Sequence, residues 1–156
     1  MLDLTGKNAL VTGIANNRSI AWGIAQQLHK AGANLGITYL SDEKGKIEKK
    51  VAELVRPLNP TLFLPCNVQN DEEVKSTFET IREKWGSLDI LIHCLAFANK
   101  DDLSGDFSQT SREGFRTALD VSTYSLVQLA GAAKPLMNAG GSIVTLSYLG
   151  AVRAVP

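Results

Sequence analysis

The sequence of 156 residues has little cysteine, no net charge and no long hydrophobic run, and each shortage excludes a class of protein. Two cysteines cannot form the dense disulfide framework of a small secreted domain, so a reduced cytoplasmic protein is the simplest interpretation. No apolar stretch is long enough to span a bilayer, and residues 1–7 lack the basic and apolar regions of a signal peptide. With 16 basic and 16 acidic residues, no surplus of positive charge favours nucleic acid. We expect neither a membrane nor a nucleic-acid partner.

What the sequence does contain is a fivefold alternation of strand-like apolar runs and helical stretches, in a chain long enough for one domain with a core. The strands are expected at residues 8–12, 34–39, 61–65, 88–94 and 142–146. Between them, apolar residues recur at the spacing of buried helix faces. The expected buried faces are Ile20, Ile24, Leu28 and Ala31, then Ile47, Val51, Leu54, Val55 and Leu58, then Val74, Phe78, Ile81 and Trp85, and last Phe115, Leu119, Leu126, Leu129, Ala133 and Met137.

Several helix boundaries carry local signals. Asn70 is followed three residues later by Glu73, which is the spacing of a capping box, and Thr110 stands in the same relation to Glu113. Gly140-Gly141 is expected to break the last helix before the fifth strand begins.

The alternation predicts the fold class. Strands rich in Val, Ile and Leu that alternate with helices indicate a parallel sheet covered on both faces. Right-handed crossovers then give an α/β, doubly wound, Rossmann-like fold, here expected as one dinucleotide-binding domain over residues 1–156 that is truncated after the fifth strand. Because such folds bind ligands outside the carboxyl ends of the strands, the candidate functional residues are those that follow each strand.

The turn after the first strand has part of a phosphate-binding pattern. A pyrophosphate needs a tight turn, a close approach of the backbone and the N-terminus of a helix. Gly13 provides the turn, and Ser19 at the start of the helix can offer its hydroxyl and its N–H. The full Gly-x-Gly-x-x-Gly fingerprint is absent, so an ordinary N-capped turn is the alternative.

This turn also carries a resemblance to a known family. Asn17 and Ser19 stand where the usual short-chain dehydrogenase has later glycines, and the run at 19–25 follows them. Together with Gly114-Phe115, Tyr124-Ser125 and the segment 146–150, this pattern resembles the divergent branch of the short-chain dehydrogenase/reductase family that contains the bacterial NADH-dependent enoyl-acyl-carrier-protein reductases. The similarity extends over all 156 residues.

The resemblance implies a set of site residues. The cofactor-binding set is Gly13, Ser19, Ile20, Leu40, Asn67, Val68 and Leu95, and Ala98 is expected to contact the acyl substrate. Asn67, where the family often has Asp, can both accept hydrogen bonds from adenine and donate to it. NADH is implied by the resemblance alone. Leu40 can neither bind a ribose 2′-OH nor pair with a 2′-phosphate, and Asp42 can equally begin the next helix.

His93 and Cys94 are adjacent and invite comparison with a nucleophile or a metal site. Neighbouring strand residues point to opposite faces, so these two side chains are not expected to converge on one atom. Two nearby ligands without others make a poor metal site. We therefore expect structural roles for the pair and no metal.

Tyr148, just beyond the fifth strand, is the expected catalytic residue in this chain. A phenol with a pKa near ~10 can donate a hydrogen bond to an enolate oxygen. The resemblance places a second tyrosine and a lysine beyond Pro156.

The implied activity is reduction of the trans-2 double bond of enoyl thioesters linked to acyl carrier protein, in fatty acid elongation. The implied full-length form is a homo-oligomer, commonly a tetramer. The alternatives are a β-ketoacyl-type reductase of the same family and a non-catalytic dinucleotide-binding protein or fragment.

Overall fold

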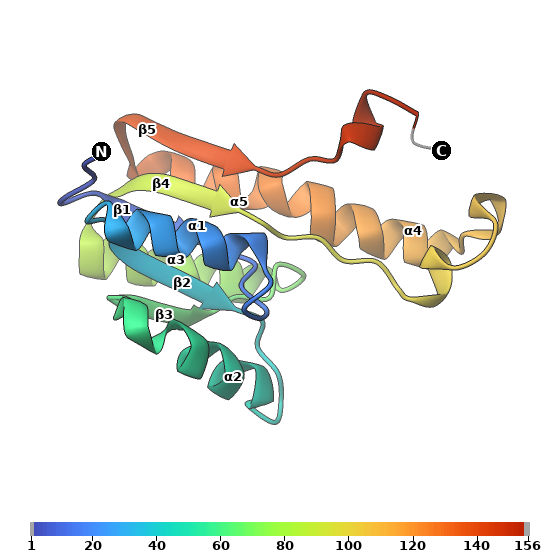
Figure 1. Ribbon diagram of the computed structural model, residues 1–156, viewed down its shortest axis with the longest axis horizontal. Helices are drawn as coiled ribbons and strands as arrows, with labels where there is room; N and C mark the ends of the chain where they lie inside the picture. The colour runs from blue at the N-terminus through green and yellow to red at the C-terminus, as the bar shows by residue number, and fades with distance from the viewer. Residues whose placement is uncertain (1, 155–156) are drawn as a thin grey trace.

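Five parallel strands form one sheet in the order β3-β2-β1-β4-β5 in the computed structural model, which describes residues 2–154. The strands are β1 (Asn8–Val11), β2 (Asn34–Tyr39), β3 (Leu62–Pro65), β4 (Leu88–His93) and β5 (Met137–Thr145). All of them run in the same direction in Figure 1. After β3 the chain crosses back over β2 and β1 to form β4 on the far side. The doubly wound parallel fold is thereby confirmed.

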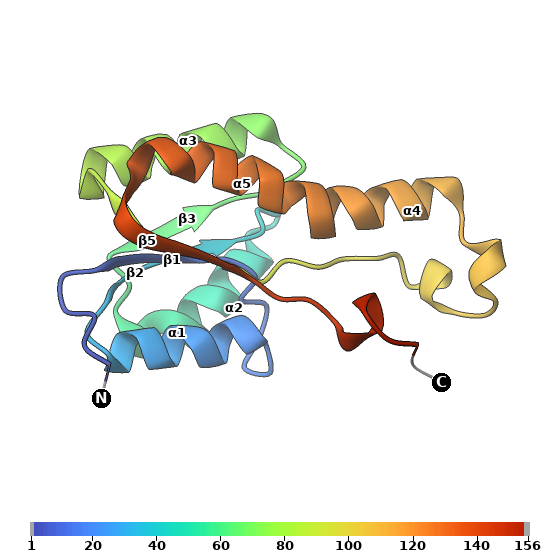
Figure 2. The same ribbon diagram turned by 90° about the horizontal axis from the view of Figure 1, so that it is seen from above.

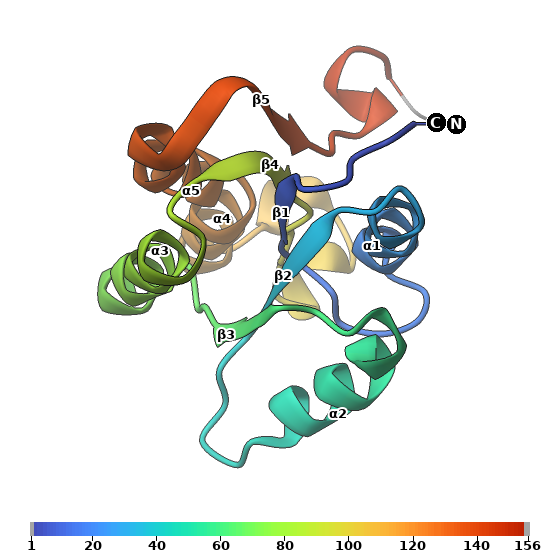
Figure 3. The same cartoon turned by 90° about the vertical axis from the view of Figure 1, so that its left-hand side faces the viewer.

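Helices cover both faces of the sheet, as Figures 2 and 3 show. One face carries α1 (Ile20–Lys30) and α2 (Lys46–Val55), and the other carries α3 (Asp71–Trp85) and α5 (Ser125–Ala133). The helix α4 (Arg112–Leu119) and the π-helical turn η4 (Asp120–Tyr124) lead directly into α5. Short 3-10 turns complete the chain: η1 (Arg56–Leu58), η2 (Asp101–Leu103), η3 (Phe107–Gln109), η5 (Lys134–Leu136) and η6 (Leu149–Ala151).

Alternation along the strands divides the core in two. In β1, Ala9 and Val11 face α1 and α2, whereas Leu10 faces α3 and α5. In β4, Ile92 joins the first cluster and Leu91 the second. Both faces of β1 and β4 are thus buried, which is why apolar residues follow one another at 9–11 and 90–92 rather than alternate with polar ones.

The helix boundaries test the capping predictions. The Asn70 side chain accepts hydrogen bonds from the N–H groups of Glu72 and Glu73, so this N-cap is confirmed. The cap predicted at Thr110 was wrong by one residue. Ser111 caps α4 by accepting from the N–H of Gly114 at 2.9 Å, because both residues are good N-caps and only one can precede Arg112.

The long buried helix expected after residue 110 was also wrong in part. Leu129 and Ala133 are buried, but Phe115 and Leu119 are 52% and 47% exposed. Figure 1 gives the reason: α4 and the loop before it extend past the carboxyl end of the sheet, so the sheet offers them nothing to pack against. The helical part also ends earlier than expected, since β5 begins at Met137 rather than after Gly141.

The β4–β5 pairing is irregular at its start. Leu88 pairs with Met137, but Ile90 pairs with Ser142, so the extra residues of β5 bulge out of the ladder. Gly140 adopts a φ of +79° within this bulge. None of the helices in the described part of the chain is both long enough and apolar enough to cross a membrane.

Candidate functional site

A crevice of about 490 Å³ lies at the carboxyl ends of the strands. Pockets for small ligands and cofactors have volumes of ~300–1,000 Å³, so it is large enough to be a binding site. Its lining comes from the tips of β1, β2, β3 and β4, from α2 and from η4. The lining residues are Gly13, Ile14, Ala15, Thr38, Tyr39, Leu40, Ile47, Lys50, Cys66, Asn67, Val68, Gln69, Cys94, Leu95, Ala96, Phe97 and Val121. Five residues of the expected cofactor set are among them: Gly13, Leu40, Asn67, Val68 and Leu95.

The tips of β1 and β4 approach closely at Gly13. This glycine has a φ of +87°, and a Cβ added to it would lie 2.0 Å from the carbonyl oxygen of Cys94. Thr12 holds the two tips together, because its hydroxyl donates to the Ile92 carbonyl at 3.0 Å and accepts from the Cys94 N–H at 3.4 Å. Only glycine fits this position, and its bare backbone forms part of the crevice wall.

The turn after Gly13 is organised around Ser19. The Ser19 hydroxyl oxygen accepts hydrogen bonds from the N–H groups of Ala15 and Asn16, both at 3.0 Å. The Ser19 N–H donates to the Asn16 carbonyl at 3.1 Å, so it is engaged within the turn. What Ser19 retains is its hydroxyl hydrogen. In the first turn of α1, the N–H groups of Ile20 and Ala21 have no intrahelical acceptor.

The side chain of Ile20 does not face the crevice. It is 65% exposed and lines a separate apolar hollow on the outer side of α1, together with Leu2, Leu4 and Ile24. If Ile20 contributes to a site in the crevice, it does so through its backbone N–H at the start of the helix.

The tip of β2 presents no free carboxylate of its own. Leu40 lines the crevice and is half exposed. The Asp42 carboxylate accepts from the N–H groups of Lys46 and Ile47 at 3.0 and 2.9 Å, and so it caps the start of α2. Burial is the largest single influence and opposes ionisation, but the backbone hydrogen bonds together outweigh it and lower the pKa of Asp42. Of the two roles open to Asp42, the structure shows the helix-starting one.

Tyr39 closes the side of the crevice next to α2. Its ring stacks on that of Phe63, with centroids 4.5 Å apart. Burial raises the pKa of the Tyr39 hydroxyl, and the carboxylates of Glu48 and Glu73 raise it further. The tip of β2 therefore lies in a negative local field, although Tyr39 itself is neutral near pH 7.

The tip of β3 is held by α3. The Asn67 N–H donates to the Glu73 carboxylate at 2.8 Å, and the Asn67 side-chain oxygen accepts from the Gln69 N–H at 3.0 Å. The group that Asn67 can still offer to the crevice is therefore its side-chain NH₂, a donor suited to an acceptor nitrogen of an aromatic base. Val68 is buried beside it. Gln69 reaches over to η4 and donates to the Asp120 carboxylate at 3.1 Å.

The segment after β4 is fastened to η4. The Ser122 hydroxyl accepts from the Phe97 N–H at 3.1 Å and donates to the Phe97 carbonyl at 3.2 Å. This two-way bond fixes the backbone that carries Leu95 and Ala96 along the crevice. Ala98, the expected substrate contact, lies just beyond the lining residues and is partly buried. A π turn at this point fits the frequent occurrence of such turns at functional sites.

His93 and Cys94 point to opposite faces, as expected. The His93 ring contacts the Ser125 hydroxyl at 2.8 Å through Nε2 and the Thr145 hydroxyl at 2.9 Å through Nδ1. Ser125 donates its only hydrogen to the Val121 carbonyl, so it accepts from Nε2–H and the neutral ring is assigned that tautomer. Burial lowers the pKa of His93. Nowhere in residues 2–154 do three His, Cys, Asp or Glu side chains gather as metal ligands.

Tyr148 lies at the same edge of the sheet but outside the crevice lining. It follows β5 directly before η6, and 71% of its surface is exposed. Its phenol is therefore accessible from solvent.

Two residues important to this site were missed from the sequence. Ser122 gives no local signal, because only the fold brings it to Phe97. Glu73 was identified as a capping-box residue, but its carboxylate binds the tips of two strands as well as the Asn70 side chain at its own helix start. Its acceptor role toward Ser41, 32 residues away, cannot be read from helical spacing.

The family model described as "Enoyl-(Acyl carrier protein) reductase" matches residues 13–156. The chain is 84% identical over 156 residues to a protein of Nostoc sp. and 62% identical to one of Synechocystis sp., both named enoyl-acyl-carrier-protein reductase (NADH). Each match covers 100% of this chain and 60% of the relative. The chain thus spans about 60% of the length of the curated relatives that it matches.

Solved structures agree with this similarity. A crystal structure of enoyl-acyl-carrier-protein reductase (NADH) from Aquifex aeolicus has 47% identity and a TM-score of 0.91, over 98% of this chain and 60% of that one. The enzyme from Anaplasma phagocytophilum, solved with NAD, has 41% identity and a TM-score of 0.92, over 100% and 59%. The Bacillus cereus enzyme, solved with NADP+ and an indole naphthyridinone, has 48% identity and a TM-score of 0.91, over 99% and 60%.

Proposed function

We propose, from the premise that the chain belongs to the enoyl-(acyl carrier protein) reductase family, that residues 1–156 form the dinucleotide-binding domain of an NADH-dependent reductase. The reaction we propose is reduction of the trans-2 double bond of an enoyl thioester carried by acyl carrier protein, as part of fatty acid elongation. The names of the relatives, which specify NADH, support the choice of cofactor.

The observation that carries this proposal is the cradle at Gly13. A ligand phosphate can approach the backbone there only because no Cβ fills the space beside Cys94. The Ser19 hydroxyl hydrogen and the first N–H groups of α1 are donors suited to a pyrophosphate. The remaining lining, with Leu40, Val68 and Leu95, suits the flat faces of an adenosine. The residues present therefore fit a dinucleotide.

The roles of the side chains follow from their positions. When bound, the nicotinamide supplies the hydride that the β-carbon of the enoyl group accepts. We assign Asn67 to the adenine, Leu40 to the adenosine and Leu95 to the cofactor ribose. Tyr148 is assigned as a hydrogen-bond donor near the thioester oxygen, where negative charge develops. Ala98 leaves room for the acyl chain because it is small.

The wider setting is proposed on the same basis. We place the protein in the cytoplasm, a setting that the free thiols of Cys66 and Cys94 fit. The partner is acyl carrier protein, which presents the substrate, and the full-length form is proposed to be a homotetramer.

The test is enoyl-thioester-dependent oxidation of NADH by the full-length protein. Crotonyl thioester and longer enoyl thioesters are offered in turn, and a β-ketoacyl thioester serves as the control substrate. Turnover of the enoyl substrates alone is expected. Turnover of the β-ketoacyl substrate instead, or dinucleotide binding without any turnover, would contradict the assignment. Separately, the Kd for NADH of the chain of residues 1–156 tests the binding part of the proposal.

A further inference from the structure

The Glu73 carboxylate lies between the tips of two neighbouring strands. It accepts from the Ser41 hydroxyl, with both oxygens 2.9 Å from Oγ, and from the Asn67 N–H at 2.8 Å. The Asn70 side chain donates to it at 3.4 Å. Ser41 follows β2 and Asn67 follows β3. Glu73 itself comes from the first turn of α3 and is only partly exposed, so its charge has a fixed place at this end of the crevice.

The position of the Glu73 carboxylate matters because Leu40 and Asp42, which follow β2, offer no free carboxylate to a ligand. In doubly wound dinucleotide folds the residues at the tip of the second strand meet the ribose 2′-oxygen, where NADP carries its additional phosphate. Leu40 has no charge, and the Asp42 carboxylate is occupied at the start of α2. The carboxylate at the tip of β2 is instead brought in from α3. Its field reaches the crevice wall, because it contributes to the raised pKa of Tyr39.

We propose that Glu73 is a specificity-determining residue, which disfavours the 2′-phosphate of NADPH by placing a fixed negative charge beside the tip of β2. The inference rests on the proposed function, since it concerns the cofactor of that site. The carboxylate acts in two ways: its hydrogen bonds to Ser41 and Asn67 position the two strand tips for either cofactor, and its charge repels only the phosphorylated one.

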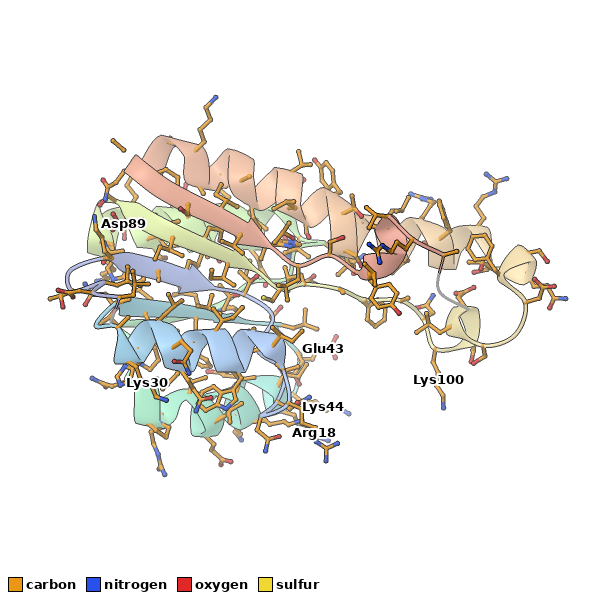
Figure 4. The ribbon with its side chains drawn as sticks, turned by 45° about the horizontal axis from the view of Figure 1, so that its top comes forward. Arg18, Lys30, Glu43, Lys44, Asp89 and Lys100 are labelled. Atoms are coloured by element: carbon orange, nitrogen blue, oxygen red, sulfur yellow. The ribbon has the colours of Figure 1, made fainter. Side chains whose placement is uncertain are left out.

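Positive side chains near the crevice would attract the 2′-phosphate that Glu73 repels. Lys50 lines it, and Figure 4 shows Arg18 and Lys44 at the same end of the molecule, with Glu43 near them. Lys50, Arg18 and Lys44 are exposed, so solvent and salt screen their charges. Glu73 is held by three donor residues and is partly buried, so its charge is screened less.

The experiment compares the Kd values of NADH and NADPH for the wild-type protein and for four variants. Glu73→Gln keeps the shape and an acceptor oxygen but removes the charge, and Glu73→Ala removes both. Glu72→Gln is the matched control, since Glu72 is exposed in the same helical turn. Lys50→Gln tests the opposing charge. Thermal melts of all five proteins report whether each variant is folded.

In Glu73→Gln we expect NADPH to bind about tenfold more tightly while the Kd for NADH changes little, because only the charge repulsion is removed. Glu73→Ala should weaken the binding of both NADH and NADPH. Glu72→Gln should change the preference by less than about twofold, and Lys50→Gln should strengthen the preference for NADH. An unchanged preference in a folded Glu73→Gln protein that binds NADH overturns this inference alone. Failure of the wild-type protein to bind either cofactor overturns the proposed function with it.

Discussion

At the amino end of the sheet the Asp89 carboxylate is buried and fully engaged, whereas at the carboxyl end Ser19 and Asn67 keep donor hydrogens that no other described residue accepts. Asp89 receives hydrogen bonds from the Asn8 N–H at 2.9 Å, the Lys7 ammonium at 3.1 Å and the Asn138 side chain at 3.0 Å. Figure 4 shows Asp89 at one end of the molecule and Arg18, Glu43 and Lys44 at the other.

The difference separates residues that stabilise the fold from residues that are available to a ligand. At the amino end, burial opposes ionisation of Asp89, but its hydrogen bonds outweigh that effect and lower its pKa. Leaving such a buried charge without its donors would be costly. At the carboxyl end, Asn67 lines the crevice, and Ser19 is bonded to Ala15, which lines it too. Their spare donor hydrogens make no bond within the described residues, so they contribute little to folding and can be used in binding. Substitutions at the two ends should therefore change different measured quantities.

Substitution of Gly13 should have the largest effect, and of the changes at the carboxyl end it should reduce stability the most. In Gly13→Ala, the left-handed backbone costs about 1–2 kcal/mol, and the Cβ beside the Cys94 carbonyl forces the strand tips apart. We expect the free energy of unfolding to fall by about 3 kcal/mol in total and NADH binding to become undetectable. Urea denaturation and titration with NADH measure the two.

Gly6→Ala at the amino end is the matched control for this change. Gly6 has a similar φ of +78°, but a Cβ added there would meet nothing within 4 Å. It should lose only about 1 kcal/mol of stability from backbone strain and keep its affinity for NADH. Equal losses in the two variants would show that the close approach at Gly13 has no importance of its own.

Asp89→Asn should break the amino end without affecting the carboxyl end. The new NH₂ group replaces a carboxylate oxygen among donors, so buried donors face one another. The free energy of unfolding should fall by about 2 kcal/mol, the usual cost of losing hydrogen bonds to a buried charge. The Kd for NADH should stay unchanged. Glu83→Gln, an exposed change of the same charge on α3, controls for net charge. A weakened Kd in a folded Asp89→Asn protein would mean that the two ends are coupled.

The sequence predicted well those elements whose burial could also be inferred from their residues. The apolar residues 90–92 of β4 can be buried only between two layers of helices, so β4 was identified correctly. Phe115 and Leu119 have equally regular spacing, but that spacing cannot reveal that their helix extends past the sheet. The start of β5 at Met137 depends on a bulge that pairing with β4 creates, and pairing is not a local property.

The candidate site also contains features that local sequence predicts and features that depend on the whole fold. Gly13 was predictable because a tight turn after a strand requires a local conformation, and the structure adds only the contact with Cys94. The hydrogen bond from the Ser19 N–H to the Asn16 carbonyl was not predictable, because it depends on how the whole turn folds back on itself. The second role of Glu73 was not predictable, since only the packing of α3 against the strand tips brings it to Ser41.

Ser19→Ala should affect the carboxyl end more mildly than a change at Gly13. Removal of the hydroxyl takes away the acceptor of the Ala15 and Asn16 N–H groups and the hydrogen that we assign to a phosphate. We expect about a tenfold weaker Kd for NADH and a loss of stability of about 1 kcal/mol or less, since the freed N–H groups can bind water. Ser19→Thr keeps the hydroxyl and serves as the control. Equal Kd values for the wild-type protein and Ser19→Ala would exclude the assigned role.

The smallest expected effect is a pH dependence of stability that distinguishes the two ends of β4. His93 is 2% exposed and its pKa is lowered by burial, so below its ordinary value of 6.5 the unfolded chain takes up a proton before the folded one does. Stability is therefore lost as pH falls below about 6.5, by at most ~1.4 kcal/mol per pH unit. Asp89, whose pKa is lowered from 3.8, adds a loss of stability only nearer pH 4.

In His93→Gln the loss of stability between about pH 6.5 and 5 should disappear. His29→Gln removes the other histidine, which is exposed, and should retain this loss. Urea denaturation across this range measures the slopes, and the same slope in all three proteins would mean that His93 is not the titrating group.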